Sequence, residues 1–295
     1  MLSILIPTYN YNVYPLVQEL ESQALKANIN FEIICIDDGS FSILNEENQK
    51  INALTNCKFI ENKKNLGLSN NRNKLVNNSQ YSNLLFIDGD SEIISKEYIN
   101  RYLKTLTKEI DIIYGGRIHP DRIENSNNKL RWRYGRLIED KSAVRRKKNS
   151  YKTLMFNNTL IKRSCFDAIK FDQSITKYGH EDTLFAYQVG LAKLNVIHIE
   201  NPIMHGDIDN DTTFLNKTEH GLLNLLYLYK SKKINPNFVR ILKLYMLIDA
   251  LRMRTLVSFL FSKFRKSMTN QLKSTNPSMF LFKLYKIGLL CSLVT

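Results

Sequence analysis

One stretch, residues 84–92 (Leu-Leu-Phe-Ile-Asp-Gly-Asp-Ser-Glu), constrains the fold of this chain more than any other. Its first four residues, 84–87, are all apolar, and such a run is typical of a strand that is buried on both faces, as in a parallel sheet covered by helices. Asp88 and Asp90 then follow the carboxyl end of the strand, at the edge of the sheet where ligands bind. Two carboxylates there can hold Mg²⁺ or Mn²⁺, and Gly89 permits a tight turn between them. The same residues are also typical of an ordinary acidic turn.

Further strand-like and helix-like stretches alternate over the first 120 residues. Strands are predicted at residues 2–6, 31–37, 58–60, 84–87 and 111–117, and helices at 13–26, 44–54, 65–77 and 96–107. This alternation indicates βαβ units, and therefore a mostly parallel α/β sheet with flanking helices. The strand at residues 31–37 also runs into acids, Asp37 and Asp38. Two strands thus bring carboxylates to one edge of the predicted sheet.

Length and composition are those of a globular protein. With 295 residues and 43% hydrophobic content, the chain can bury a full core. Cys35, Cys57, Cys165 and Cys291 show no C-x-x-C spacing, which favours free thiols in the cytoplasm over disulfides or zinc. The first strand begins at Leu2 with no basic and apolar signal segment before it, which also predicts a cytoplasmic location.

The net charge of +14 is concentrated at the C-terminal end. From residue 222 onward there are thirteen Lys or Arg residues and one acid, Asp249, whereas the first 221 residues are nearly balanced. Residues 129–152 form a second basic stretch, with ten Lys or Arg against Glu139 and Asp140.

The C-terminal part, residues 211–295, has the pattern of a basic amphipathic helical tail. Leu244, Leu247, Ile248 and Leu251 follow i, i+3, i+4, i+7 spacing with basic residues between them. Its apolar segments are shorter than the roughly 18 to 20 residues that a spanning helix needs. We expect the tail to lie on an anionic membrane surface, on the inner face of the plasma membrane. A helical extension that packs on the first domain or mediates dimerisation is the alternative.

Five segments of the chain occur in the order and spacing of family 2 glycosyltransferases, and the chain resembles this family over residues 2 to about 205. They are residues 3–10 (Ser-Ile-Leu-Ile-Pro-Thr-Tyr-Asn), 36–40 (Ile-Asp-Asp-Gly-Ser), 65–72 (Asn-Leu-Gly-Leu-Ser-Asn-Asn-Arg), 86–90 (Phe-Ile-Asp-Gly-Asp) and 179–182 (Gly-His-Glu-Asp).

The resemblance implies a Rossmann-like GT-A fold for a catalytic domain at residues 1–210, with a nucleotide-binding half at 1–118 and an acceptor half at 119–210. It further implies a nucleotide-diphosphate sugar donor, with UDP preferred over GDP or dTDP, and Mn²⁺ or Mg²⁺ as cofactor. The sugar would pass with inversion to a hydroxyl of a glycan or lipid-linked acceptor in cell-surface polysaccharide synthesis.

The predicted donor site begins with groups that can recognise a nucleotide. Asp37 and Asp38 can accept hydrogen bonds from a uracil imide and a ribose hydroxyl, and the resemblance matches Asp38 to the base-reading acid. An ordinary Asp-Gly turn is the alternative. Pro7, Thr8 and Tyr9 are expected to wrap the base.

The remaining donor contacts concern the phosphates and the metal. Asn65 and Arg72 lie in a predicted loop and the start of a helix. The free N–H groups there and the Arg72 guanidinium can approach the ribose or phosphates. A capped surface helix is the alternative. Asp88 and Asp90 are the predicted metal ligands, with Asp88 also close to the nucleotide. His205 matches a position where some family members place a third metal ligand or a phosphate contact, although a lone loop histidine is also compatible with simple exposure.

The candidate catalytic pair is Glu181-Asp182. An inverting transfer needs one carboxylate that takes the proton from the acceptor hydroxyl. The resemblance assigns this role to Asp182, with Glu181 orienting the acceptor or Asp182. Acids in a first helical turn also occur for capping and dipole reasons alone. His180 and Thr183 depart from the family pattern, where an aromatic and an acidic residue are frequent, which leaves the acceptor open.

The acceptor side is predicted from two further stretches. Residues 156–161 resemble the family strand that borders the acceptor, so Asn157 and Asn158 are expected to contact sugar hydroxyls, together with His180. The basic residues 125–150 predict either a mobile solvated loop or a lid over the donor diphosphate, with Arg131, Arg133 and Arg136 as candidates.

Two other functions compete with the transferase. A nucleotidyltransferase can share such a sheet, but a glycine-rich phosphate loop with lysine is expected near its amino terminus, and residues 7–10 (Pro-Thr-Tyr-Asn) form no such loop. A non-catalytic nucleic-acid-binding protein would explain the basic charge. No helix-turn-helix, zinc or RNA-binding signature accompanies that charge, which belongs to an apolar-rich tail.

Overall fold

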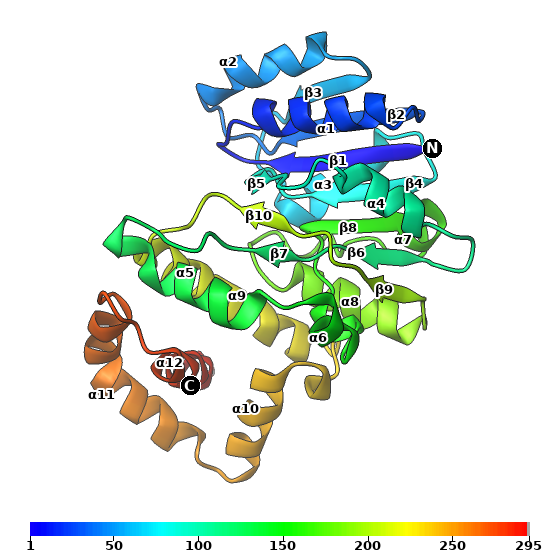
Figure 1. Ribbon diagram of the computed structural model, residues 1–295. Helices are drawn as coiled ribbons and strands as arrows, with labels where there is room; N and C mark the ends of the chain where they lie inside the picture. The colour runs from blue at the N-terminus through cyan, green and yellow to red at the C-terminus, as the bar shows by residue number, and fades with distance from the viewer. Residues whose placement is uncertain (294–295) are drawn as a thin grey trace. The chain divides into compact units, whose positions relative to one another are not determined.

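The structure is a computed structural model that describes residues 1–293, and these pack into two units (Figure 1). The first unit comprises Met1–Ile118, Asp140–Thr176 and Glu181–Asp207. The second comprises His119–Glu139, Lys177–His180 and the chain from Ile208 onward. The predicted functional boundaries at residues 118 and 210 stay predictions, because packing alone does not test them.

The first unit is built on a seven-stranded sheet with the strand order β3-β2-β1-β4-β8-β6-β9. The strands are β1 (Leu2–Thr8), β2 (Phe31–Asp37), β3 (Cys57–Glu61), β4 (Asn83–Ile87), β6 (Ile112–Tyr114), β8 (Asn158–Lys162) and β9 (Val196–His198). Strands β1 to β4 are parallel, and β8 is antiparallel to its neighbours β4 and β6. The predicted, mostly parallel α/β sheet is thus confirmed.

A second, three-stranded sheet has the order β5-β10-β7. It pairs β5 (Ser91–Glu92), β10 (Ile203–His205) and β7 (Arg117–Ile118). The antiparallel pairing of β10 with β5 sets His205 opposite Ser91, the residue after Asp90. This small sheet brings the segment around residue 205 to the end of β4.

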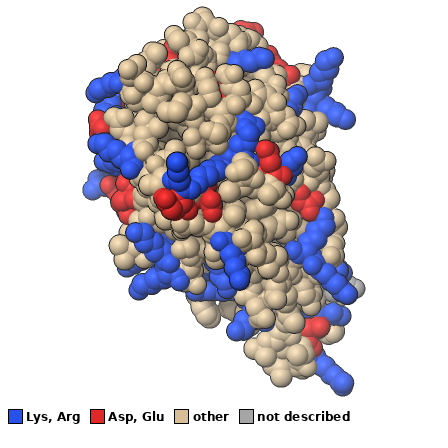
Figure 2. All heavy atoms as spheres, turned by 90° about the vertical axis from the view of Figure 1, so that its right-hand side faces the viewer, with Lys and Arg blue, Asp and Glu red and all other residues tan. Residues whose placement is uncertain are grey.

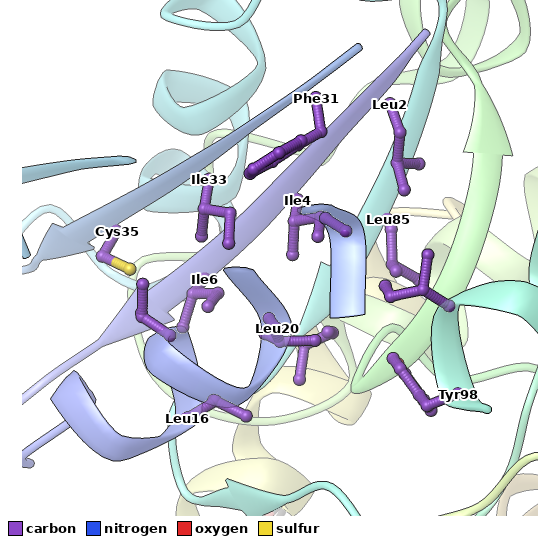
Figure 3. Packing of buried hydrophobic residues seen from close by; sticks show 14 of the residues in the cluster. Leu2, Ile4, Ile6, Leu16, Leu20, Phe31, Ile33, Cys35, Leu85 and Tyr98 are labelled. Atoms are coloured by element: carbon purple, nitrogen blue, oxygen red, sulfur yellow. The ribbon is translucent and has the colours of Figure 1, made fainter. Parts of the chain in front are cut away.

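Helices cover both faces of the main sheet, because its central strands are apolar on both sides. The helices and turns of this unit are α1 (Tyr14–Lys26), α2 (Leu44–Asn48), η1 (Gln49–Ala53), α3 (Leu68–Asn77), α4 (Tyr98–Thr105), α6 (Ala143–Lys147), η4 (Tyr151–Thr153), α7 (Arg163–Ile169) and α8 (Glu181–Leu191). On one face, Leu16 and Leu20 of α1 pack against Ile4 and Ile6 (Figure 3). On the other, the Phe86 ring lies 5.5 Å from that of Phe166 on α7.

The second unit is helical. Its elements are η2 (Ser126–Asn128), α5 (Lys129–Tyr134), the π-helical η3 (Gly135–Glu139), α9 (Asp211–Lys230), η5 (Pro236–Phe238), α10 (Arg240–Ala250), α11 (Arg254–Leu272) and α12 (Met279–Ser292). The predicted helical C-terminal region is confirmed. In the described part of the chain, we find no helix with the length and apolar character needed to cross a membrane.

The basic stretch at residues 125–150 is largely helical, which differs from the mobile solvated loop that was one of its two predicted alternatives; the lid stays a prediction. Arg131 pairs with Glu139 at 3.0 Å, and Arg136 pairs with Asp121 at 3.0 Å. Arg146 is buried in the first unit and donates to the carbonyls of Gly115 and Ile199, at 3.0 and 2.6 Å. These cations stabilise local structure because each has acceptors within its own unit.

Candidate active site

The carboxyl ends of β1, β2 and β4 meet at one edge of the main sheet. Thr8 lies opposite Asp37 in the parallel pairing of β1 with β2. The Asp88 amide donates to the Asn157 carbonyl at 3.2 Å, because antiparallel β8 begins where β4 ends. The edge therefore gathers predicted site residues from four strands that are distant in sequence: Pro7, Thr8, Tyr9, Asp37, Asp38, Asp88, Asp90, Asn157 and Asn158.

Asp37 and Asp38 are buried and hold the loops that follow them. Asp37 accepts from the amide and hydroxyl of Ser40, at 2.8 and 2.7 Å. Asp38 accepts from the amides of Leu66 and Gly67, both at 2.9 Å. The pair therefore ties the turn after β2 to the loop before α3, where exposed Asn65 also accepts from the Gly67 amide at 3.0 Å.

Two glycines permit this close approach of loops. Gly39 has φ +71°, and a Cβ there would lie 2.5 Å from the Lys64 carbonyl carbon. Gly67 has φ +83°, and its Cβ would lie 2.4 Å from the Thr176 carbonyl oxygen. Both residues combine a left-handed backbone with a space that admits no side chain, so substitution would displace the loops beside the site.

Arg72, on α3, joins the two groups of carboxylates that the sequence had assigned to different tasks. Its side chain is 1% exposed, with Nη1 2.6 Å from Asp182 Oδ1 and Nη2 3.0 Å from Asp88 Oδ1. Glu181 Oε1 lies 3.9 Å from Nη1, and the guanidinium stacks over the Phe171 ring at 5.1 Å. Arg72 is thus enclosed by protein groups and acts on the carboxylates rather than projecting into solvent.

Burial and charge compete at this cluster. Burial acts to lower the pKa of Arg72, but Asp182, Asp88 and Glu181 outweigh it and hold that pKa above its ordinary value. Burial raises the pKa of Asp88; the positive charge of Arg72 opposes this shift, while Asp90 and Asp182 add to it. Arg72 therefore remains charged and compensates the carboxylates crowded around it.

Asp182 lies in the first turn of α8, and both its oxygens accept hydrogen bonds. Oδ1 accepts from Arg72, and Oδ2 accepts from the Phe156 amide at 3.0 Å. The Asp182 side chain remains 23% exposed, whereas that of Glu181 is 7% exposed. Asp182 thus has both oxygens held by protein donors, and it is the more exposed of the two predicted catalytic acids.

Asp90 and His205 form a second pair at the edge. Asp90 Oδ2 lies 3.1 Å from His205 Nε2, and the small sheet holds them together. No group of three or more His, Cys, Asp or Glu side chains with metal-binding geometry occurs among residues 1–293. Two carboxylates with one imidazole nevertheless fit a hard cation, because Mg²⁺ commonly takes one or two carboxylates together with substrate phosphates and water.

Asn157 and Asn158 are adjacent but differ in their hydrogen bonding. Asn158 Oδ1 accepts from Tyr98 and Tyr102, both at 2.6 Å, and its Nδ2 donates to the carbonyls of Gly116 and Asn201, at 2.7 and 2.9 Å. Its amide is used fully inside the protein, so the predicted acceptor contact gives way to a structural role. The Asn157 amide is buried, and within the described residues neither of its polar atoms has a hydrogen-bond partner.

The Thr8 hydroxyl is a second buried polar group that lacks a hydrogen-bond partner among the described residues. It is buried at the end of β1 and has no hydrogen-bond partner in residues 1–293. Buried polar groups are normally satisfied, so two unsatisfied ones at a ligand-binding edge indicate positions that a polar ligand would complete. Burial cannot be read from isolated residues, which is why the sequence did not separate Asn157 from Asn158.

His180 belongs to the second unit, with Lys177–His180. The Asn224 amide on α9 donates to the carbonyls of Lys177, Tyr178 and Gly179, at 2.8, 3.2 and 3.0 Å. Burial lowers the pKa of His180 to about 4, with a smaller contribution from Lys286. His180 is therefore neutral near pH 7.

Sequence reasoning missed two contacts of the candidate base: the ion pair from Arg72 and the amide of Phe156. Arg72 was predicted to approach the ribose or phosphates, because its side chain closes a motif at a helix start. Its burial among Asp88, Asp182 and Phe171 depends on segments up to 110 residues apart. The order of the motifs alone could have indicated that Arg72 and Asp182 lie near each other, but not that they form an ion pair.

Comparisons with known proteins give the following matches. The model of the family described as Glycosyl transferase family 2 matches residues 3–170, more than half of the chain. The mannosyltransferase PcManGT from Pyrobaculum calidifontis, in complex with GDP-Man and Mn²⁺, superposes with a TM-score of 0.56 at 12% identity, over 99% of this chain and 86% of that one. No curated protein sequence matches.

TarS from S. aureus is similar as well. TarS 1-349 in complex with UDP-GlcNAc gives a TM-score of 0.52 at 16% identity, over 97% of this chain and 90% of that one. A longer TarS structure gives 0.50 at 17% identity, and there the match spans 76% of this chain but only 39% of TarS. At these identities the likeness concerns the fold.

The two asparagines provide a matched test of the assignment. We expect Asn158→Leu to lower the free energy of unfolding by at least about 2 kcal/mol, because it removes four buried hydrogen bonds, from the Tyr98 and Tyr102 hydroxyls and to the Gly116 and Asn201 carbonyls. Asn157→Leu is expected to leave stability unchanged or raise it, because it removes an unsatisfied amide. Urea denaturation followed by circular dichroism measures both, and equal losses would contradict the assignment.

His180 predicts a pH dependence of stability. Its pKa is about 4 in the folded protein, against an ordinary value of 6.5, so between these values the unfolded chain binds a proton that the folded chain does not. His180 therefore lowers stability as the pH falls from about 6.5 to about 4, by up to about 1.4 kcal/mol per pH unit. His180→Gln should flatten this slope in urea denaturation. Exposed His220→Gln is the control, and an unchanged slope in His180→Gln would refute the prediction.

Proposed function

Because this chain belongs to glycosyltransferase family 2, we propose that it is an inverting, metal-dependent hexosyltransferase. It takes the sugar from a nucleotide-diphosphate donor, with UDP preferred, and transfers it to a hydroxyl of a glycan or lipid-linked acceptor. Its product is part of a cell-surface polysaccharide.

The observation that carries the proposal is the bridge made by Arg72. One guanidinium contacts Asp88, at the predicted phosphate and metal position, and Asp182, the predicted base, at 3.0 and 2.6 Å. Group transfer requires the leaving group and the attacking hydroxyl to lie on opposite sides of one carbon, only a few ångströms apart. A shared guanidinium keeps the two carboxylates at such a separation.

Asp182 is the general base in this proposal. Its carboxylate takes the proton of the acceptor hydroxyl as the hydroxyl oxygen forms a bond to the anomeric carbon. The bond from that carbon to the diphosphate breaks on the opposite side, and its electron pair stays on the phosphate oxygen. The Arg72 and Phe156 contacts hold the carboxylate plane, so little reorganisation is needed when the proton moves.

The donor side uses the sheet edge. Asp88, Asp90 and His205 would hold Mn²⁺ or Mg²⁺, which supplies positive charge to the leaving diphosphate. The Thr8 hydroxyl and the Asn157 amide offer hydrogen bonds to the donor, since both are buried without partners among the described residues. The complexes of PcManGT with GDP-Man and Mn²⁺, and of TarS with UDP-GlcNAc, support a nucleotide sugar and a divalent cation as the ligands to test.

Arg72 is a positioning residue in this scheme. It touches both carboxylates but is itself 1% exposed, so it acts on substrate through Asp88 and Asp182. Its charge also offsets the repulsion between these acids, which a neutral side chain of similar length would leave uncompensated.

Donor binding is the first quantity to measure. We expect UDP to bind the wild type by calorimetry in the presence of Mn²⁺ and much more weakly without it. Asp90→Ala should remove this metal dependence, because it deletes one of the two carboxylates. Exposed Asp121→Ala, in the second unit, serves as the control. If UDP, GDP and dTDP all fail to bind the folded wild type with metal present, the transferase proposal is wrong.

The base is tested separately from the donor site. Asp182→Asn should lower kcat by about 10²–10⁴ while UDP affinity changes little, since the amide cannot take the proton. Donor hydrolysis or transfer to a sugar acceptor provides the rate, and calorimetry provides the affinity. A variant that retained wild-type kcat would exclude Asp182 as the base, and Glu181→Gln would then be examined.

A further inference from the structure

Helix α11 of the second unit is apolar on two opposite sides. Phe261 and Leu272 are buried on one side, where the Phe261 ring lies 5.3 Å from the Tyr285 ring on α12. Leu256, Phe259 and Leu260 share the other side at i, i+3, i+4 spacing. Leu256 is 51% exposed and Phe259 is 62% exposed. A surface helix normally carries polar residues on its solvent side, so this stripe is unusual.

Helix α10 repeats the arrangement. Leu242 and Tyr245 are buried, and the Tyr245 ring lies 6.3 Å from the Tyr229 ring on α9. On the opposite side, Leu244 and Leu247 are exposed, and Leu251 continues this stripe just past the helix end with 59% exposure. The sequence had identified the same spacing as one amphipathic face, and the structure directs it to solvent.

The two stripes are neighbours along the chain at the turn from α10 into α11. Leu251 and Met253 are exposed at this corner, and Arg252 between them adopts φ +57°. We call the exposed apolar set on α10, α11 and this turn the corner face; it consists of Leu244, Leu247, Leu251, Met253, Leu256, Phe259 and Leu260.

Positive charge surrounds the corner face. Arg240, Lys243, Arg252, Lys263 and Lys266 lie beside it, and none of these five has an ion-pair partner within residues 1–293. The only acid after residue 221, Asp249, is paired with Arg254 at 3.3 Å. The lower end of Figure 2, where Figure 1 draws this corner, shows a largely uncharged surface bordered by Lys and Arg, with acidic atoms beside them.

We propose that the corner face docks this protein onto an anionic lipid bilayer. Exposed Leu, Met and Phe side chains can enter the region between headgroups and acyl chains, while the surrounding Lys and Arg contact anionic headgroups. Apolar insertion at the centre and headgroup contacts around it match the observed pattern of an apolar centre with a basic rim.

Charge also argues against a second copy of the chain as the occupant. A two-fold contact through the corner face would set Arg252, Lys263 and Lys266 of one copy near the same cations of the other. No free acid on α10, α11 or the turn would compensate them, so such a contact is opposed by like-charge repulsion. A bilayer that contains anionic lipid presents the opposite charge.

The test uses the full chain and vesicle flotation. We expect binding to vesicles of phosphatidylglycerol mixed with phosphatidylcholine, and at least about tenfold weaker binding to phosphatidylcholine alone. The double variant Leu251→Glu/Phe259→Glu should weaken binding to the mixed vesicles by at least about tenfold. The matched control, Leu25→Glu/Leu191→Glu, places the same charges at exposed leucines of the first unit and should change binding by less than about twofold.

A milder variant tests the rim without altering apolar residues. Arg252→Gln/Lys263→Gln/Lys266→Gln should reduce binding to the mixed vesicles and its salt sensitivity, whereas Lys26→Gln/Lys104→Gln/Lys108→Gln, on the first unit, should not. Circular dichroism establishes that each variant is folded.

Three outcomes would overturn the proposal. One is a wild type that does not float with the mixed vesicles. Another is equal loss of binding in the test and control variants. The third is a concentration-dependent dimer, seen by analytical ultracentrifugation, that Leu251→Glu/Phe259→Glu dissociates while no vesicle binding occurs; the corner face would then belong to a second copy.

Discussion

The candidate site depends on one buried cation. Arg72 lies within 3.0 Å of Asp88 and within 2.6 Å of Asp182, with almost no exposure to water. Burying a guanidinium is unfavourable unless anions compensate it, and burying carboxylates is unfavourable unless cations do. Each group in this cluster therefore requires the others. Strand β4, helix α3 and helix α8 are held in one arrangement by this mutual requirement.

The hydrogen bonds of Asn158 are a second constraint on the site. Asn158 uses its whole amide to connect two tyrosines of α4 with the carbonyls of Gly116 and Asn201. It also begins antiparallel strand β8, so it sets where that strand meets β4. The neighbouring Asn157 is then placed at the sheet edge, where its buried amide has no hydrogen-bond partner in the described part of the chain. A structural asparagine thus positions one that is suited to a ligand.

The second unit leaves apolar side chains of two helices exposed. Its helices bury one apolar side within the unit, as Phe261 does against Tyr285. Helices α10 and α11 nevertheless keep a second apolar side exposed, beside cations that have no ion-pair partner among residues 1–293. A folded domain gains nothing within itself from exposing Leu251 or Phe259. The unfavourable exposure of these side chains is explained if a bilayer covers them in place of a protein partner. Catalysis and placement in the cell would then belong to different units of one chain.

Much of the fold followed from the sequence, because its signals are local. The apolar runs ending in Asp37 and in Asp88 predict buried strands and their ligand edge, and the ordered motifs predict the family. The basic residues 125–150 left a mobile loop and a lid open as alternatives. Sequence did not reveal that this stretch is largely helical, because Arg146 has its acceptors at Gly115 and Ile199, outside the stretch. Periodicity identified the Leu244 stripe but not the direction in which it points.

The sequence by itself determined the α/β class, the acidic strand ends and the basic helical tail, since each depends on residues close together in the chain. Only the tertiary structure decided that Arg72 pairs with Asp182 across 110 positions and that Leu251 and Phe259 remain exposed. It also decided that, within residues 1–293, the Asn158 amide has hydrogen-bond partners and the Asn157 amide has none. These are properties of burial and of long-range pairing. They arise from which surfaces exclude water together, and no local pattern contains that information.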